Sequence, residues 1–364
     1  MTLKVLALTP LPPAGAAGRY RVFQYVEPLR AHGIEMRAEP FFDDVAFARL
    51  YQPGRIVQKG WDLARLTPTL RNRLRSAGHY DVVLVHRELW PLAGDWPLAM
   101  LRAAQPRWVF DLDDAVFMPN VSDANRRFVG LKSHGGVPAI AADAQQVAAG
   151  NGWLAAWARD QRPGKPAGSV DVIPTVVDSD HWTPVTPADD GTIRLLWIGS
   201  PSTLPYLEAW GPVLSQLGTR HRALELHLIG ARWELPGLRC ISHAWSADTE
   251  LAIARRCHIG LSPLADGDWE RGKCGLKQLL YMALALPAVA SCAGVHPEIV
   301  TSGQDGELVS NDAELAAALE RLIRDPDHRA TIGRAAREKL VNRYSIRAVA
   351  PRLAGLLRRA AEPE

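Results

Sequence analysis

The sequence has few cysteines, almost no net charge and no membrane-length hydrophobic run, and each shortage excludes a class of protein. Its four cysteines form no C-x-x-C pair and have no histidine at zinc-site spacing, so neither a disulfide-rich secreted domain nor a zinc module is expected. Lys and Arg total 42 against 39 Asp and Glu, so the net charge of +3 points to no particular partner. We expect reduced thiols in the core of a cytosolic protein, at Cys240, Cys257, Cys274 and Cys292.

Two stretches resemble export or membrane signals and are better explained as buried α/β structure. The apolar run at residues 5–8 is too short for the core of a signal peptide. Residues 279–295 hold 17 positions without a charge, against roughly 20 that span a bilayer, and Pro287 divides them into a helix end and a strand. We therefore predict no transmembrane span.

Short apolar runs alternate with helical patterns along the chain, which is typical of parallel sheets covered by helices. A helix is predicted at residues 20–32, between the first two strands. The proline- and aspartate-rich segment 171–184 suits a linker, so we predict α/β domains at 1–178 and 179–345 and a C-terminal helix at 346–364 that packs back on the first. The predicted strands are residues 3–8, 35–39, 82–85, 108–110 and 146–149, then 194–198, 225–229, 259–261 and 288–290.

The segment from Arg271 to Lys277 carries three cations within seven residues, with glycines between them, immediately before a predicted helix. The helix dipole favours negative charge at that end, so this arrangement calls for an anion. Lys273 and Lys277, with the backbone N–H groups of Gly272 and Gly275, are expected to neutralise a diphosphate as it leaves. A solvated basic loop is the alternative.

Two other parts of the second domain offer candidate donor contacts. Gly199, Ser200 and Ser202 follow a predicted strand and open a helix, where free N–H groups favour a phosphate. A simple turn capped by Ser202 or Thr203 explains them equally well. Glu298 also follows a strand, where it is placed either to accept from a sugar hydroxyl or to stabilise a helix start.

Charged side chains gather at strand ends in the first domain. Asp111 and Asp113 have the spacing to hold a divalent cation, but we favour the alternative that Asp113 or Asp114 caps a helix or holds an acceptor hydroxyl. His86 and Arg87 end a buried strand, at the edge where ligands of open α/β sheets bind. His86 is therefore a candidate catalytic residue, with a structural histidine as the alternative.

The loop after the first strand carries small residues together with Arg19 and Arg21. Guanidinium groups bind polar and anionic ligands, so these two arginines are expected to contact an acceptor, with a flexible turn as the alternative. The loop is not a dinucleotide-binding fingerprint, because Gly15 and Gly18 lack a third glycine at the right spacing.

Residues 49–75 form a basic amphipathic stretch, with seven Lys or Arg, one Asp and interleaved leucines and aromatic residues. This pattern suits an anionic membrane surface. Nucleic acid is the other anionic candidate, and it is not expected as a partner because neither a stacking platform nor a groove-reading helix accompanies the cations.

The second domain resembles the retaining nucleotide-sugar glycosyltransferases of the group 1 type, glycosyltransferase family 4. The similarity rests on residues 272–283, 286–291, 294–300 and 305–306, and weaker similarity extends to most of the first half. The resemblance implies an α/β GT-B fold, in which two Rossmann-like domains with parallel sheets face across a cleft. It also implies a nucleotide-sugar in the C-terminal domain, an acceptor in the N-terminal one, and no metal or other cofactor.

One departure from the family concerns two glutamates separated by seven residues. They align with Gly272 and Leu280, neither of which is acidic. In the family these glutamates contact the donor sugar and the donor ribose, so the sugar and the retention of configuration stay open for this chain.

We expect a hexosyltransferase that moves a sugar from a nucleoside diphosphate to a glycan or lipid-linked acceptor in bacterial surface polysaccharide or glycoconjugate synthesis. It is expected in the cytoplasm or on the inner face of the cytoplasmic membrane. The alternatives are a nucleotide-sugar epimerase, a phosphorylase on the same fold, or a non-catalytic partner subunit. The candidate catalytic residues are Lys277, Lys273, His86 and Asp113; the donor contacts are Gly199, Ser200, Ser202, Arg271, Gly272, Gly275 and Glu298; the acceptor contacts are Arg19, Arg21, Arg87 and Asp114.

Overall fold

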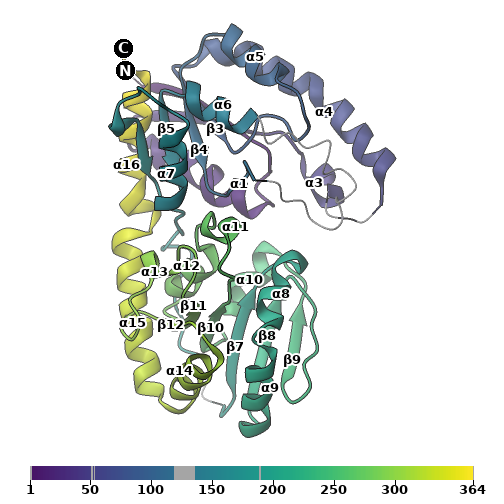
Figure 1. Cartoon of the computed structure of the whole chain (residues 1–364), viewed down its shortest axis with the longest axis vertical. Helices are drawn as coiled ribbons and strands as arrows, with labels where there is room; N and C mark the ends of the chain where they lie inside the picture. The colour runs from purple at the N-terminus through teal and green to yellow at the C-terminus, as the bar shows by residue number, and fades with distance from the viewer. Residues whose placement is uncertain (1, 51, 53, 119–135, 188–189, 364) are drawn as a thin grey trace. The chain divides into compact units, whose positions relative to one another are not determined.

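The computed structural model describes residues 2–50, 52, 54–118, 136–187 and 190–363, and these form two compact units (Figure 1). The first unit contains residues 1–175, 272–274 and 346–364, and the second contains residues 176–271 and 275–345. Each unit is built on a six-stranded sheet in which every pairing is parallel. The first division falls after Thr175, three residues before the boundary predicted at 178.

The first sheet has the strand order β2-β1-β3-β4-β5-β6. Its central strands are continuous apolar runs, because helices cover both faces of a parallel sheet and bury every side chain. The five strands predicted here are confirmed, and β6 is additional. The strands are β1 (Leu3–Thr9), β2 (Ile34–Pro40), β3 (Val82–His86), β4 (Trp108–Leu112), β5 (Gln146–Ala149) and β6 (Val170–Val172).

The helices of the first unit differ from the prediction near residues 20–32. A single helix was expected there, but α1 ends at Arg21, a 3-10 turn follows at Phe23–Tyr25, and α2 begins at Val26. Pro28 lies in the first turn of α2, where its missing N–H costs no helical bond, and it could not have continued a longer helix. The helices are α1 (Ala16–Arg21), α2 (Val26–Arg30), α3 (Asp44–Leu50), α4 (Ile56–Ser76), α5 (Trp96–Ala103), α6 (Gly136–Asp143), α7 (Gly152–Asp160) and α16 (Ile346–Ala361).

The second sheet has the order β12-β11-β10-β7-β8-β9. The chain builds outward from β7 through β8 and β9, then returns to the other side of β7 with β10, β11 and β12. This reversal makes the carboxyl ends of β7 and β10 the place where ligands of such folds bind. The four predicted strands are confirmed, while β9 and β12 are additional. The strands are β7 (Ile193–Ile198), β8 (Leu224–Ile229), β9 (Arg239–His243), β10 (Ile259–Ser262), β11 (Ala288–Ser291) and β12 (Glu307–Val309).

The helices of the second unit follow the predicted alternation with the strands. The helix expected after β7 is divided into two, α8 and α9, with Trp210 between them. The helices are α8 (Leu204–Glu208), α9 (Gly211–Arg220), α10 (Ala247–Ala254), α11 (Asp268–Arg271), α12 (Leu276–Ala283), α13 (His296–Ile299), α14 (Asp312–Arg324) and α15 (Pro326–Arg343).

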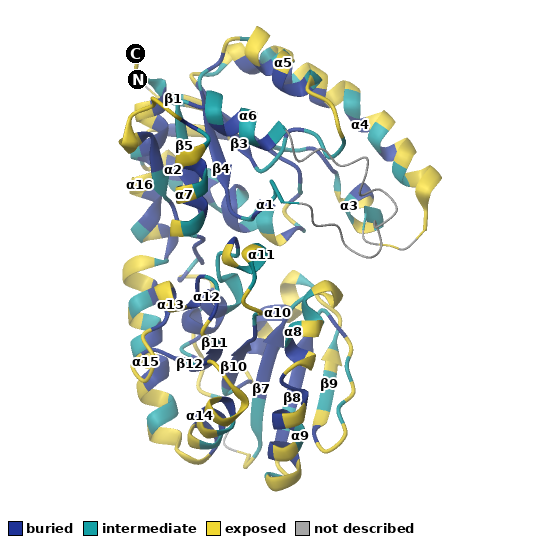
Figure 2. Cartoon of the chain, in the orientation of Figure 1, coloured by how far each residue is buried: buried dark blue, intermediate teal, exposed yellow. Residues whose placement is uncertain are grey.

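The last helix, α16, packs against α2 and β5 of the first unit (Figure 2). Its apolar face, which includes Val349, Leu353 and Leu357, is buried. Arginines on its other side donate to backbone carbonyls of the same unit, such as Arg352 to Val172 at 2.6 Å. Residues far from the N-terminus in sequence therefore complete the first core.

The four cysteines are free thiols, but they are not all in the core as expected. Cys257 is buried, Cys240 and Cys274 are half-buried, and Cys292 is exposed. The prediction is wrong for Cys292 because this residue lies just after β11, where the chain has left the sheet. In the parts of the chain that the structure describes, no helix is both long and apolar enough to cross a membrane.

Candidate functional site

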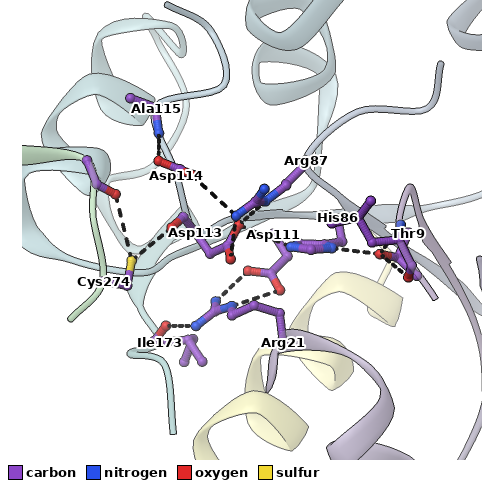
Figure 3. Close-up of polar contacts among 12 residues, drawn as sticks. Thr9, Arg21, His86, Arg87, Asp111, Asp113, Asp114, Ala115, Ile173 and Cys274 are labelled. Carbon is purple, nitrogen blue, oxygen red and sulfur yellow. Dashed lines mark hydrogen bonds and ion pairs between the residues drawn. The ribbon is translucent and has the colours of Figure 1, made fainter. Parts of the chain in front are cut away.

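The carboxyl edge of the first sheet carries a network of charged side chains (Figure 3). Thr9 ends β1, His86 ends β3, and the acidic residues Asp111, Asp113 and Asp114 lie at the end of β4 or just after it. Parallel strands bring their carboxyl ends to one edge of the sheet, which is why residues so distant in sequence meet here.

Arg21 is enclosed in this network. Its side chain is 2% exposed; Nε donates to Asp111 at 3.3 Å, Nη2 donates to the other oxygen of that carboxylate, and Nη1 donates to the carbonyl of Ile173 at 2.7 Å. Burial alone would lower the pKa of Arg21, but the charge of Asp111, its hydrogen bond to Arg21 and the charge of Asp113 together raise it. Every part of the guanidinium is used inside the fold. These contacts give Arg21 a structural role, and its predicted contact with an acceptor stays a prediction.

Asp113 is held by three polar contacts. Arg87 donates to it from Nε at 2.5 Å and from Nη2 at 3.1 Å, and Nε2 of His86 lies 3.1 Å from Oδ1. Burial would raise the pKa of Asp113, yet Arg87 and His86 hold it well below its usual range. A carboxylate with so low a pKa is a weak general base at neutral pH, so Asp113 is suited to orient or attract a group rather than to take its proton.

His86 is fully buried and contacts Asp113. Because an ionised Asp113 can only accept, Nε2 of His86 carries the hydrogen and donates to it. On the other side of the ring, Nδ1 lies 2.8 Å from Oγ1 of Thr9. The His86 side chain has no exposed surface, and its predicted catalytic role stays a prediction.

Residues 272–274 belong to the first unit, although the residues on both sides belong to the second. Nζ of Lys273 lies 3.1 Å from both carboxylate oxygens of Asp114, and Asn151 donates to the carbonyl of Lys273 at 3.0 Å. At Gly272 a Cβ would lie 2.6 Å from that of Ala115, so only glycine fits there. The structure thus places Lys273 with Asp114, whereas Lys277 belongs to the second unit.

Cys274 shares this segment. Its thiol donates to the carbonyl of Asp113 at 3.1 Å (Figure 3). Burial and the neighbouring charge of Asp113 raise the pKa of the Cys274 thiol, so it remains protonated and can act as this donor.

In the second unit, Lys277 reaches the turn after β7. Gly275 begins α12 with a φ of 67°, a left-handed conformation that favours glycine, and Lys277 lies in the first turn. Its Nζ donates to Oγ1 of Thr203 at 3.3 Å and lies 4.6 Å from the ring centroid of Trp197. Lys277, a residue predicted to bind the diphosphate, therefore lies at the carboxyl end of β7, where the strand order reverses.

The turn itself contains the other predicted donor contacts, Gly199, Ser200 and Ser202. A Cβ on Gly199 would lie 2.4 Å from the Trp197 ring and 2.7 Å from Oγ1 of Thr203, so only glycine leaves room for both. The hydroxyls of Ser200 and Ser202 lie 2.8 Å apart on the surface. The capping alternative is not seen: Thr203 precedes α8 without a side-chain cap bond, and Ser202 lies inside the 3-10 turn Pro201–Thr203 rather than at a cap position.

The structure also describes the surroundings of the remaining predicted residues, Arg271, Glu298 and Arg19. Arg271 is half-exposed and pairs with Asp268 at 3.2 Å. Glu298 is exposed on α13. Arg19 lies in the last turn of α1, and its guanidinium lies over the ring of Tyr20. None of these positions is tested by the structure, so their roles stay predictions.

Sequence reasoning missed Trp197, Tyr281 and His296 beside Lys277. Trp197 and Tyr281 look like core residues in the sequence, since each occurs within an apolar run. His296 is buried; its Nδ1 lies 3.0 Å from the carbonyl of Ser291 and its Nε2 lies 3.1 Å from Oγ of Ser262. Burial lowers the pKa of His296 to about 4, and the charge of Lys277 contributes, so the imidazole is neutral at pH 7.

The basic stretch 49–75 is less uniform in the structure than in the sequence. Its leucines at 66, 70 and 74 pack in the core, and three of its arginines are paired with carboxylates: Arg49 with Asp62 at 2.5 Å, Arg65 with Asp43 at 2.8 Å, and Arg73 with Glu39 at 2.5 Å. Residues 51 and 53 lie outside the described residues. The outer face of α4 exposes Val57 and Trp61, 82% and 68% accessible, together with the arginines at 71 and 75 (Figure 2).

Comparison with known proteins agrees with this geometry. Residues 203–325 match the family model described as "Glycosyl transferases group 1". This segment is similar to a group 1 glycosyl transferase domain. The predicted resemblance is thereby confirmed for this segment, which includes Thr203, Lys277 and His296.

The chain is also similar to curated proteins. The alpha-maltose-1-phosphate synthases of Mycolicibacterium smegmatis and Mycobacterium tuberculosis are each 26% identical over 212 residues, which cover 48% of this chain and 53% of theirs. The chain therefore spans about half the length of the curated relatives it matches.

Solved structures extend the similarity over both units. HepE of Anabaena, in complex with UDP and glucose, matches with a TM-score of 0.63 at 18% identity, covering 98% of this chain and 99% of that one. Sucrose-phosphate synthase of Thermosynechococcus elongatus matches with a TM-score of 0.65 at 17% identity, covering 98% of each chain. The expected α/β GT-B fold is confirmed.

Proposed function

We propose that the protein transfers a sugar from a nucleoside diphosphate donor to a hydroxyl of a glycan or lipid-linked acceptor. The observation that carries the proposal is the position of Lys277, whose ammonium lies beside the Gly199–Thr203 turn at the strand-order reversal of the second sheet. Structures of HepE, which shares the fold, are described as complexes with UDP and with UDP-glucose. A pyrimidine nucleotide-sugar is therefore the first donor to test.

The chemistry breaks the bond between the anomeric carbon and the diphosphate oxygen and forms a bond from that carbon to the acceptor oxygen. The bonding electrons leave with the diphosphate, whose negative charge grows toward the transition state. Lys277 and the N–H groups of the turn are placed to offset that charge. Asp113 is too weak a base to take the proton of the acceptor hydroxyl, so that proton passes to an oxygen of the departing diphosphate, whose negative charge grows as its bond to the sugar breaks. We propose that Asp113 and Asp114 orient the acceptor.

We extend the proposal to a hexosyl donor, retained configuration and independence from metal ions, on the strength of the family resemblance. The two carboxylates with the spacing to hold a metal ion bind arginines instead, Asp111 to Arg21 and Asp113 to Arg87, which supports independence from metal ions. A role in bacterial surface polysaccharide or glycoconjugate synthesis is also part of the proposal, and identification of the acceptor tests it.

The test is replacement of Lys277 by Ala, with Lys165→Ala, an exposed lysine of the first unit, as the matched control. Loss of one charge-stabilising group lowers kcat by about 100- to 1000-fold, and the control should turn over like the wild type. Wild-type turnover in the Lys277 variant would reject the assignment of this residue.

A thermal-shift panel of UDP, GDP and ADP tests donor binding independently of the acceptor. A nucleotide at 100 times its dissociation constant adds about 2.7 kcal/mol of stability. No shift with any of the three would favour a non-catalytic partner subunit. Conversion of the donor without an acceptor would favour an epimerase, and a requirement for inorganic phosphate would favour a phosphorylase.

We also propose that the protein works at the inner face of the cytoplasmic membrane, docked through the outer face of α4. The support is charge and exposure: between residues 55 and 76 the sole acid is Asp62, which is buried, whereas Val57, Trp61, Arg71 and Arg75 are exposed. Apolar side chains flanked by cations suit an anionic bilayer.

Vesicle sedimentation tests this second proposal. Wild-type protein should bind vesicles that contain phosphatidylglycerol more than neutral phosphatidylcholine vesicles, and salt should weaken binding. A Trp61→Glu variant should lose this preference, whereas Trp245→Glu, a change at an exposed tryptophan of the second unit, should keep it. Equal sedimentation of the wild type with both kinds of vesicle would reject membrane docking through α4.

A further inference from the structure

Two side chains that have no role in the proposed function, those of Tyr281 and Thr203, hold Lys277 in position. Lys277 and Tyr281 are four residues apart on α12 and therefore share one face of the helix. We propose that Tyr281 and Thr203 are positioning residues: Tyr281 fixes α12 against the sheet, and Thr203 fixes the Lys277 ammonium beside the turn after β7. The inference rests on the proposed role of Lys277 as the cation that meets the diphosphate.

Tyr281 joins the two strands on either side of the strand-order reversal. Its hydroxyl accepts from the backbone N–H of Ile198, on β7, at 3.1 Å and donates to the carbonyl of Leu261, on β10, at 3.1 Å. The side chain is fully buried. Burial raises the pKa of Tyr281, so the phenol stays neutral and can both donate and accept.

The ring of Tyr281 also packs closely on the sheet. A Cβ on Gly260 would lie 2.4 Å from the Tyr281 ring, so the ring packs directly on the backbone of β10. Gly260 pairs with Leu196 of β7, and the phenol bridges the same two strands farther toward their carboxyl ends. The ring and hydroxyl together therefore set both the distance and the rotation of α12 relative to β7.

Thr203 fixes the other end of the lysine side chain. Its hydroxyl donates to the carbonyl of Ser200 at 3.1 Å, which leaves an oxygen lone pair to accept from Nζ of Lys277 at 3.3 Å. The buried indole of Trp197 provides a π face 4.6 Å from the same nitrogen. The ammonium is thus held from two directions at the turn.

His296 provides a neutral neighbour for this ammonium. Its Nδ1 donates to the carbonyl of Ser291, so the other nitrogen is free of a proton and accepts from the Ser262 hydroxyl. A neutral imidazole adds no second positive charge beside Lys277. Local repulsion therefore does not displace the lysine from the position that Thr203 and Tyr281 define.

Two conservative variants test the proposal: Thr203→Val, which keeps the shape but removes the hydroxyl, and Tyr281→Phe, which keeps the ring. Thr203→Ser restores the hydroxyl. The matched controls are Thr219→Val and Tyr344→Phe, which remove hydroxyls that donate to backbone carbonyls elsewhere in the second unit, at 3.0 and 3.4 Å.

The first measurement is the rate at which acetic anhydride labels Lys277 in the protein without nucleotide, followed by peptide mass spectrometry. The second is kcat and KM with UDP-glucose or with the donor found active in the nucleotide panel. Loss of a hydrogen bond to a charged group corresponds to roughly a 10- to 100-fold effect, so we expect Thr203→Val to lower kcat by about this factor. Tyr281→Phe removes bonds to two neutral backbone groups, so we expect it to lower kcat by a smaller factor. Both variants should change the labelling of Lys277. Thr203→Ser should behave like the wild type.

Wild-type labelling and kcat in both test variants would overturn the proposal, as would equal effects in the matched controls. Altered labelling with unchanged sugar transfer, together with unchanged transfer in Lys277→Ala, would keep the positioning role and reject the proposed function instead. Thr203 is half-buried in a surface turn, so its variants test the proposal even where Tyr281→Phe fails to fold.

Discussion

The clearest energetic prediction concerns Arg21. Replacing it with Met leaves Asp111, which is 3% exposed, as a buried carboxylate without its guanidinium, and leaves the carbonyl of Ile173 without a donor. Breaking a buried ion pair from one side costs about 3–5 kcal/mol, and an unsatisfied buried carbonyl adds about 1 kcal/mol. We therefore expect Arg21→Met to lower the free energy of unfolding of the first unit by about 4–6 kcal/mol.

The double variant Arg21→Met, Asp111→Leu separates this effect from a loss of packing. It removes both charges, and apolar replacement of a whole buried pair is often neutral, so most of the lost stability should return. Arg102→Met is the matched control, because Arg102 pairs with Asp143 at the surface and such a pair contributes about 0–1 kcal/mol.

Urea denaturation combined with hydrogen exchange of peptides from β4 measures this effect, because exchange reports the first unit even where the two units unfold separately. A cost below about 1 kcal/mol, or a double variant as unstable as Arg21→Met, would refute the structural role. If Arg21 bound the acceptor instead, Arg21→Met would raise the acceptor KM while the stability stayed near that of the wild type.

Three further predictions concern pH and packing. The pKa of His296 is about 4 in the fold against roughly 6.5 in the unfolded chain, so stability should fall by about 3 kcal/mol as pH drops through this window, and a His296→Gln variant should show a shallower fall in urea melts. The pKa of Asp113 is lowered in the fold, so its contribution to stability is present above about pH 4 and is lost below it. Asp113→Asn should therefore reduce the fall in melting temperature below about pH 4 and leave the fall due to His296 unchanged. A Gly272→Ala variant should lose roughly 1–3 kcal/mol, since its methyl group would lie 2.6 Å from Ala115, whereas Gly168→Ala, with open space around it, should melt like the wild type.

The sequence predicts the sheets well because their strands are buried and apolar. Residues such as 82–85 and 194–198 are short apolar runs followed by loop residues, and each became a strand within two residues of its predicted ends. The missed strands lie at sheet edges and are short or half-exposed. Arg239–His243, for example, contains an arginine and a histidine and pairs along one side, so no apolar run marks it.

The candidate site was harder to predict than the fold because partner choice is decided in three dimensions. Lys273 and Lys277 look equivalent in the sequence, yet one contacts Asp114 and the other contacts Thr203 and Trp197. Arg21 looks like a ligand-binding arginine in a small-residue loop, but the carboxylate that buries it lies 90 residues away. Neither spacing nor periodicity carries such information.

The origin of α16 affects how the first unit can be made in the cell. Its apolar face covers helix α2 and strand β5, about 200 residues or more earlier in the chain, so that patch of core stays open while the whole second sheet is synthesised. Domains generally fold in order as they emerge from the ribosome, but this unit cannot finish until residues 346–361 arrive. A fragment ending at residue 178 should therefore expose apolar surface and aggregate. The same fragment joined to residues 346–361 by a flexible linker should stay monomeric, because α16 then covers that surface.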